Sequence, residues 1–133
     1  MLDVIGSIKN LQETTERHFL HIKNQHDFIR IWAIQFEITY TDFRVIQMAL
    51  QLANEGALLS EFTQAYQAVY QFEYAFAEGG LPVFNQQFGK QMSEYEHAKN
   101  HLRDVLERIR QQQPPVTAEN DLISVSYTHL TLP

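Results

Sequence analysis

The residues of this sequence that could do chemistry, by their types and spacing, are a glutamate and two histidines toward its C-terminal end. Glu94 precedes His97 by three residues, and His101 follows four residues later. Residues three and four apart share one face of an α-helix, so a carboxylate and two imidazoles could reach one metal ion. Glu61 is the carboxylate of the preceding predicted helix that lies at roughly the same level. These four side chains are the candidate ligands for iron or another divalent metal ion.

Two known kinds of helix share this pattern. Residues 93–109 are similar to the metal-binding helix of ferritin-like proteins, and His97 with His101 resembles the H-x-x-x-H helix of hemerythrin-like domains. The resemblance implies a metal-binding bundle of carboxylates and histidines. The rest of the chain departs from both families, because it has a single E-x-x-H pair and no histidine between His26 and His97. The alternative interpretation is a solvated flank of alternating charge beside the core stripe.

A second group of candidates is the tyrosine ladder of Tyr66, Tyr70 and Tyr74, which repeats at intervals of four residues. The ladder lies on a helical face next to an apolar stripe, so we expect it to be partly exposed. Tyrosine is frequent at binding hot spots because it buries a large area at a small entropic cost. The ladder therefore predicts a partner-binding surface. The alternative is that it packs against the first helix, with the hydroxyls at the rim.

Three further titratable residues stand close to apolar faces. Glu73 falls at the edge of an apolar stripe, where we expect it to turn its carboxylate to water or to pair with a nearby base. His18 and His21 are three residues apart on the first helix, and we expect them to pack or to lie at the surface. The sequence contains no nucleophile elbow, Walker loop or dinucleotide-binding motif. It therefore predicts no catalytic residue and favours a protein that is not an enzyme.

The elements that must position all these residues are helices. Apolar side chains recur at helical spacing in four stretches, and strand-like alternation is absent. The stretches are residues 5–22, 28–54, 58–76 and 84–109. Short connections imply that consecutive helices are antiparallel neighbours. We predict an all-α, compact antiparallel bundle of four helices, or of five if the second stretch breaks between Thr39 and Asp42.

The second stretch, residues 28–54, differs from the others because it is apolar nearly all round. A helix that is hydrophobic on every side is usually a buried one, so we predict that it is the central element of the bundle. Together with the tyrosine ladder, it leaves more apolar helix surface than one small bundle can cover. We therefore expect self-association.

Turn signals separate the predicted helices. A polar cluster at residues 24–27 forms the first break, and the alternative is one very long helix that runs straight through it. The second break ends at Gly56, which we expect to take a left-handed cap conformation. Gly79 and Gly80 end the third helix, and Pro82 is suited to begin the next one. Gly89 then weakens the first turns of the last helix.

Composition excludes several classes of protein. The chain has 133 residues, which favours one domain, and it has no cysteine, which excludes disulfides and thiolate zinc sites. Its net charge of −6 disfavours direct binding to nucleic-acid phosphates and to anionic membranes. Neither a membrane-spanning run nor a signal peptide is recognised. We expect a cytoplasmic protein that needs no cofactor.

The predicted helical domain covers residues 1–113, because Pro114 and Pro115 stop the last helix. Residues 114–124 are expected to be a linker or a disordered end. Residues 125–133 look like a translated sequencing adapter, since the codons GTC TCT TAT ACA CAT CTG ACG CTG CCG encode them in order. We therefore expect this tail to be non-native, which leaves open whether the natural protein continues past about Ser124.

The predicted function is that of a non-enzymatic helical interaction module. It would act through protein–protein contacts or self-association, with a regulatory role as one form of this. The alternative is the metal-binding, ferritin-like or hemerythrin-like bundle.

Overall fold

The computed structural model of the chain describes residues 1–27 and 30–113. This part contains the helices α1 (Ile5–Lys23), α2 (Arg30–Leu52), α3 (Gly56–Phe88) and α4 (Met92–Gln111). No strand occurs among the described residues, and the helices pack on one another. The predicted all-α bundle of four helices is confirmed. The predicted linker and adapter-like tail, residues 114–133, lie outside the described residues.

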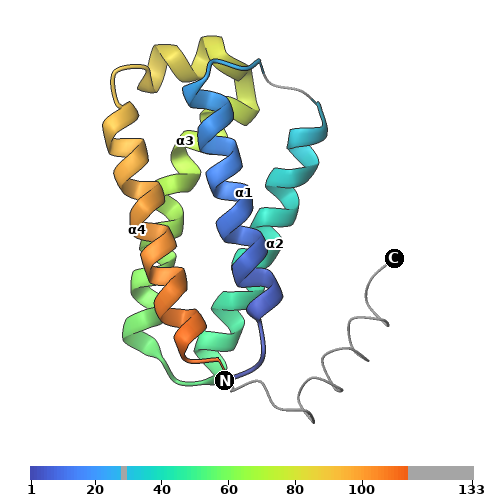
Figure 1. Cartoon of the computed structure of the whole chain (residues 1–133), viewed down its shortest axis with the longest axis vertical. Coiled ribbons are helices and arrows are strands. Elements are labelled where there is room, and N and C mark those ends of the chain that lie inside the picture. Colours follow the sequence, from blue (N-terminus) through green and yellow to red (C-terminus); the bar gives the residue numbers. More distant parts are fainter. Residues whose placement is uncertain (28–29, 114–133) are drawn as a thin grey trace.

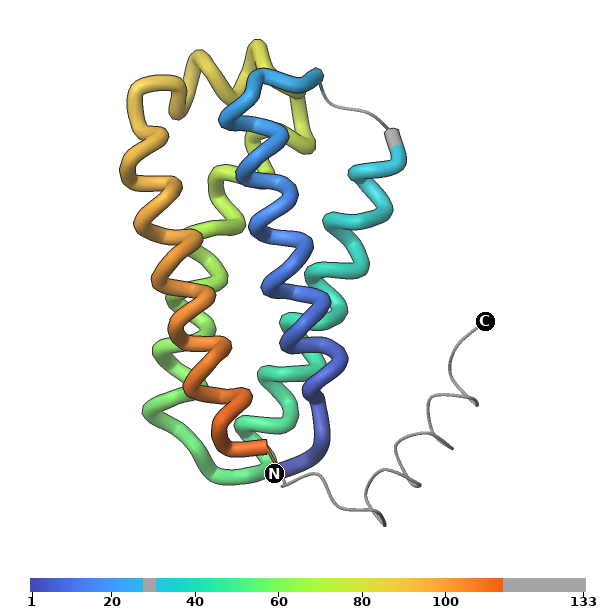
Figure 2. The backbone as a smooth tube through the Cα atoms, viewed as in Figure 1, coloured from blue at the N-terminus to red at the C-terminus, as the bar shows by residue number. Residues whose placement is uncertain are grey.

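The helices run alternately up and down along one long axis (Figure 1). Both α1 and α3 pack against α2 and α4, so consecutive helices are neighbours, and α1 also touches α3 across the bundle. The tube in Figure 2 shows the same order around the bundle. The two ends of the described chain meet, because the backbone N–H of Val4 donates to Oε1 of Gln113 at 2.7 Å. Short turns between neighbours thus produce the antiparallel arrangement.

The core forms where one apolar stripe from each helix meets the others. Aromatic rings gather around Tyr95 of α4, which stacks on Phe72 with 4.7 Å between ring centroids and meets Phe19 edge-on at 4.9 Å. Such offset and edge-to-face pairs add to the free energy gained by burial. Further large apolar side chains with almost no exposure are Ile8, Leu11, Ile22, Ile46, Leu50, Phe62, Val69, Phe76, Phe84, Leu102, Val105, Leu106 and Ile109.

The prediction that the second helix is central is wrong. α2 packs on α1 and α3 with one face, and its opposite face is exposed. Its apolar composition therefore reflects two separate apolar faces. No helix among the described residues, α2 included, combines the length and the apolar character needed to cross a membrane.

The suggested break in α2 is absent, so the bundle has four helices and not five. The hydroxyls of Thr39 and Thr41 donate to the carbonyl oxygens of Gln35 and Glu37 at 2.7 and 3.1 Å. Each threonine thus bonds the carbonyl four residues back, which keeps the hydroxyl within the helix instead of opening it.

The turn between α2 and α3 uses a different left-handed residue from the predicted one. Asn54 has a φ of 58°, and Gly56 begins α3. Asparagine is the residue that most often replaces glycine in this cap position. The N–H of Glu55 then donates to the carbonyl of Leu50 at 3.0 Å, which closes the end of α2.

α3 changes direction at Gly80, as the pair of glycines predicted. Gly80 has φ 68° and ψ −158°, a backbone conformation that is essentially restricted to glycine. Pro82 follows in the first turn of the next helical piece, where its missing N–H leaves no bond unmade. This last piece of α3 crosses one end of the bundle (Figure 1, yellow).

The last helix begins later than predicted, at Met92. The chain reverses after Gly89, where the N–H of Gln91 donates to the carbonyl of Phe88 at 2.8 Å. Phe88 still contacts the core, with its ring centroid 4.7 Å from that of Phe72. The apolar spacing thus continues through two helical pieces that cover the same core from different directions.

The kink yields a test of the backbone. Gly80→Ala should lower the free energy of unfolding by about 1–3 kcal/mol, because a side chain strains this conformation. Gly6→Ala is the matched control, since Gly6 is helical and nothing lies within 4 Å of an added Cβ. The control should raise the free energy by about 0.5–1 kcal/mol. Urea unfolding measures both, and equal effects of the two substitutions would contradict the role of Gly80.

Candidate functional site

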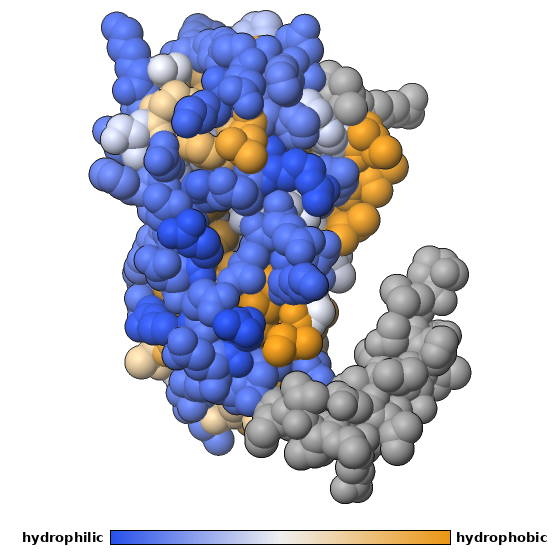
Figure 3. Space-filling model, viewed as in Figure 1, coloured by the Kyte–Doolittle hydropathy of each residue, from blue (hydrophilic) through white to orange (hydrophobic). Residues whose placement is uncertain are grey.

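The largest group of exposed apolar side chains in the described chain lies on the outer face of α2. Six of its side chains are between 40 and 65 % exposed. They form the outer stripe, which consists of Ile31, Ile34, Ile38, Val45, Met48 and Leu52. Figure 3 shows apolar surface at the edge of the molecule, over the first half of α2. A contiguous stripe of this kind is typical of a contact surface, whereas scattered apolar residues are normal on any protein.

The outer stripe follows the heptad spacing of a coiled-coil seam. Its residues alternate at intervals of three and four, and Thr41 takes the one position that is not apolar. The Thr41 hydroxyl is satisfied inside its own helix by the carbonyl of Glu37. Trp32, Phe43 and Leu50, on the opposite face of α2, are buried against the bundle. The core is therefore complete without the side chains of the outer stripe.

Charged side chains flank the outer stripe. Glu37 and Arg44 are exposed on one flank, seven residues apart. Asp42 lies on the flank toward α1, where Nδ2 of Asn10 donates to its Oδ2 at 2.5 Å. Partial burial raises the pKa of the Asp42 carboxyl, and hydrogen bonds from Asn10 and Ser7 oppose this rise. Asp42 is thus tied to its own bundle, whereas Glu37 and Arg44 can reach a molecule that covers the stripe.

The predicted tyrosine ladder divides into a buried part and an exposed part. Tyr66 is 3 % exposed and stacks on Phe43 of α2, with 4.1 Å between the ring centroids. Tyr70 and Tyr74 are 39 and 53 % exposed, and their ring centroids are 5.9 Å apart. The ladder therefore starts in the contact between α2 and α3 and not against α1. A partner could reach Tyr70 and Tyr74, but not Tyr66, without repacking the bundle.

The candidate metal ligands are brought together only in part. Glu61 forms an ion pair with Arg108, and its Oε1 lies 3.9 Å from Nε2 of His101. Glu94 and His97 are exposed on earlier turns of α4. Within residues 1–27 and 30–113, no three histidine, cysteine, aspartate or glutamate side chains gather closely enough to hold a metal ion. The structure thus joins Glu61 to a guanidinium and one imidazole, without assembling the four predicted ligands.

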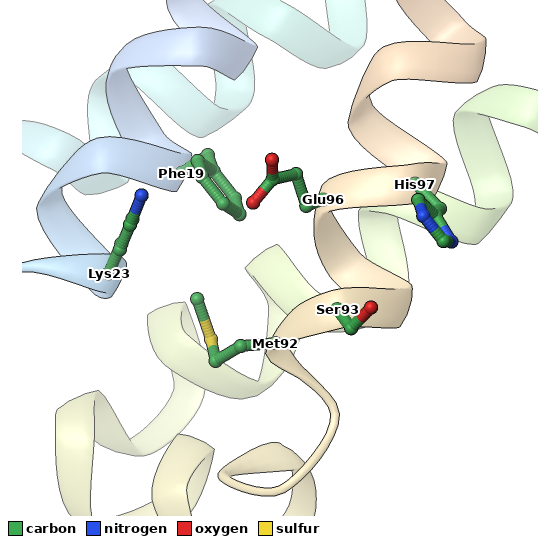
Figure 4. A pocket seen from close by; sticks show the side chains of 6 residues that line it. All are labelled: Phe19, Lys23, Met92, Ser93, Glu96 and His97. Carbon is green, nitrogen blue, oxygen red and sulfur yellow. The ribbon is translucent and has the colours of Figure 1, made fainter.

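A broad depression of about 380 Å³ lies between α1 and α4. Its lining residues are Phe19, Lys23, Met92, Ser93, Glu96 and His97. Figure 4 shows that Glu96 points from α4 toward Phe19, whereas His97 lies on the other side of the α4 ribbon. The depression combines single charges of opposite sign with two apolar side chains. It does not bring titratable groups together on one point, as a catalytic site requires.

A buried polar contact joins α1 to α3. Nδ1 of His18 is hydrogen-bonded to Oε2 of Glu73, and both side chains are 2 % exposed. The His18 ring also packs on Phe36 of α2, with 4.2 Å between the ring centroids. A nearby base was one of the expected partners of Glu73. The sequence could not identify His18 as that base, because α1 and α3 are not consecutive helices. The only signal was that both residues adjoin core positions on their own helices.

His21 lies where α1 meets the start of α2. Its ring centroid is 4.2 Å from that of Trp32, and its Nδ1 is 3.1 Å from Nδ1 of His26. Desolvation lowers the pKa of His21, and electrostatic repulsion from His26, His18 and Arg17 lowers it further. The contact of its ring with the Trp32 indole gives His21 a packing role at this turn.

Comparisons of the chain with protein-family models, with curated proteins and with solved structures found no match. The functional candidates therefore rest on the geometry of the chain itself. Among them, the outer stripe is the one feature that combines six exposed apolar side chains in one line with charges on its flank.

Proposed function

We propose that this chain is a non-enzymatic helical interaction module that binds another polypeptide through the outer face of α2. The observation that carries the proposal is the outer stripe. Its side chains lie opposite the face that closes the core, so folding of the bundle does not require them. Burial of apolar surface is the main favourable term in protein association, and this stripe offers such surface along α2 with Thr41 as its one polar position.

Other features of the chain suit the same role. Tyr70 and Tyr74 are proposed as further contact residues, because they are exposed and tyrosine is frequent at binding hot spots. The net charge of −6 favours a partner with a neutral or basic surface and opposes contact with nucleic-acid phosphates. The proposal extends to a cytoplasmic location, which suits a chain without cysteine.

Site-specific photo-crosslinking in intact cells that produce this chain tests the proposal. A photo-reactive side chain in place of Met48, within the outer stripe, should give a covalent adduct with a polypeptide. The same side chain in place of Arg103, which is exposed on α4, should give none. The proposal fails if position 48 gives no adduct, or if both positions give the same adducts in equal amounts.

A further inference from the structure

We infer that the outer face of α2 is covered by a second copy of this chain, with the two α2 helices antiparallel about a twofold axis. The inference rests on the proposed function and names the partner. A twofold contact requires a surface that is complementary to itself. The outer stripe meets this requirement in its spacing and in the charges beside it.

The spacing of the outer stripe suits a pair of identical helices. From Ile31 to Leu52 it covers three heptads, a length of about 32 Å at the rise of an α-helix. A seam sustained over three heptads is typical of coiled-coil pairing, in which each side chain inserts between four of the facing helix. In an antiparallel pair the first and fourth heptad positions face each other. The resulting layers are Ile31 with the partner's Met48, Ile34 with the partner's Val45, and Ile38 with the partner's Thr41, while Leu52 extends beyond the partner's Ile31.

The charges on the flank select the direction and register of this pairing. In the register just described, Glu37 lies next to the partner's Arg44, and the twofold axis repeats the contact. A parallel pair would instead place Glu37 next to the partner's Asp42, which opposes two acids. An antiparallel pair shifted by one heptad would place Arg44 next to the partner's Arg44. Of the three arrangements, only the first opposes unlike charges, and such flanking contacts set orientation in paired helices.

The first part of the test is the association state of the purified full chain, measured by sedimentation equilibrium over a range of concentrations. We expect a monomer–dimer equilibrium. Ile38→Glu should raise the dissociation constant by at least about tenfold, because it places two carboxylates beside the twofold axis. Leu20→Glu is the matched control, since Leu20 is 44 % exposed on α1, outside the stripe, and it should leave the constant unchanged. Circular dichroism checks folding, and Met48→Glu serves as a second variant if Ile38→Glu does not fold.

The second part of the test is charge reversal. Glu37→Arg and Arg44→Glu should each weaken the dimer several-fold, because each opposes like charges at both symmetry-related contacts. The double variant should return the dissociation constant to within about twofold of the original value. Tightening by Glu37→Arg alone would indicate the parallel pair and overturn the antiparallel one. If the dissociation constant of the double variant does not return toward the original value, the proposed register is wrong.

The outcomes also separate this inference from the function on which it rests. A chain that stays monomeric, or a dimer that Ile38→Glu leaves unchanged, overturns the second copy as the occupant. An adduct at position 48 with the mass of a different protein also overturns the second copy as the occupant, but it supports the proposed interaction module. An adduct within a single chain overturns both, because a segment of the same polypeptide then covers the stripe. An adduct of twice the chain mass, with the expected charge-reversal pattern, supports both.

Discussion

Replacing Glu73 with leucine is expected to lower the free energy of unfolding by about 1–3 kcal/mol. The substitution leaves the His18 imidazole buried without the carboxylate that meets its Nδ1. His18→Leu should have a loss of similar size, because it leaves a carboxylate buried between α1 and α3. A buried polar group without its partner pays the desolvation penalty with nothing to offset it.

The double variant His18→Leu/Glu73→Leu is expected to recover most of that loss. Both polar groups are then gone, and two apolar side chains fill a site that Phe36 already lines. Replacing both partners of a buried hydrogen bond by apolar groups of similar shape can be nearly neutral or stabilising. Urea unfolding at one fixed protein concentration gives the three values and the coupling energy of the pair. Fixing the concentration matters because association also contributes to stability.

Two results would contradict this account of the pair. One is a single substitution with a loss under about 1 kcal/mol, which is typical of surface positions. The other is a double variant whose loss equals the sum of the single losses, since independent sites add and coupled sites do not. Glu73→Gln is the conservative control. It keeps a side-chain carbonyl of similar reach, so it should lose less than Glu73→Leu.

Each of the four helices also holds one buried polar atom that is not satisfied by any residue that the structure describes. Four buried atoms, one from each helix, lack a hydrogen-bond partner within the described residues. They are Nε2 of His18, Oε1 of Gln35, Oε1 of Glu73 and the hydroxyl of Tyr95. Burial raises the pKa of Tyr95, and the charge of Glu73 adds to the rise, so these two groups are close enough to interact. Sliding one helix by a turn would separate His18 from Glu73, and their contact thus favours a single alignment of α1 with α3.

Most of the fold could be predicted from local signals. The apolar spacing indicated four helices, and the conformation of Gly80 with Pro82 behind it matched the expected break. The position of α2 could not be predicted, because a central helix and a peripheral helix with two apolar faces have the same composition. The outer stripe separates these cases only once α1 and α3 are seen to cover one face alone.

The candidate site could be predicted less fully than the fold, for a related reason. Spacing along one helix gives the face on which a residue lies, but not which neighbour covers that face. Tyr66, Tyr70 and Tyr74 therefore looked equivalent, although α2 buries only the first of them. Glu61 was placed at the right level, since it lies 3.9 Å from His101, yet its ion pair with Arg108 could not be foreseen. Contacts between helices that are not consecutive, such as His18 with Glu73, were the least predictable.

Tyr66→Ala is expected to lower the free energy of unfolding by about 3–5 kcal/mol, because it removes a buried ring and leaves a cavity between α2 and α3. Tyr66 stacks on Phe43, and burial, with the charge of Glu73 adding to it, raises the pKa of its hydroxyl. Tyr66→Phe is the matched control and should keep most of the stability, since the stacked ring remains. Tyr70→Ala and Tyr74→Ala should each cost less than about 1 kcal/mol, as exposed positions usually do.

The same four variants separate the structural part of the tyrosine ladder from its proposed binding part. In urea unfolding at a fixed concentration, Tyr66→Ala should stand apart from the other three. In photo-crosslinking from position 48, Tyr70→Ala and Tyr74→Ala should reduce the adduct if these rings contact the partner, while the unfolding curves stay in place. Equal losses of stability at all three tyrosines would show that the ladder is buried as a unit, and it would then have no exposed ring to offer. Loss at Tyr66 alone, with weaker crosslinking at Tyr70 or Tyr74, places the boundary between core and contact surface within one turn of α3, because neighbouring rungs of the ladder are four residues apart.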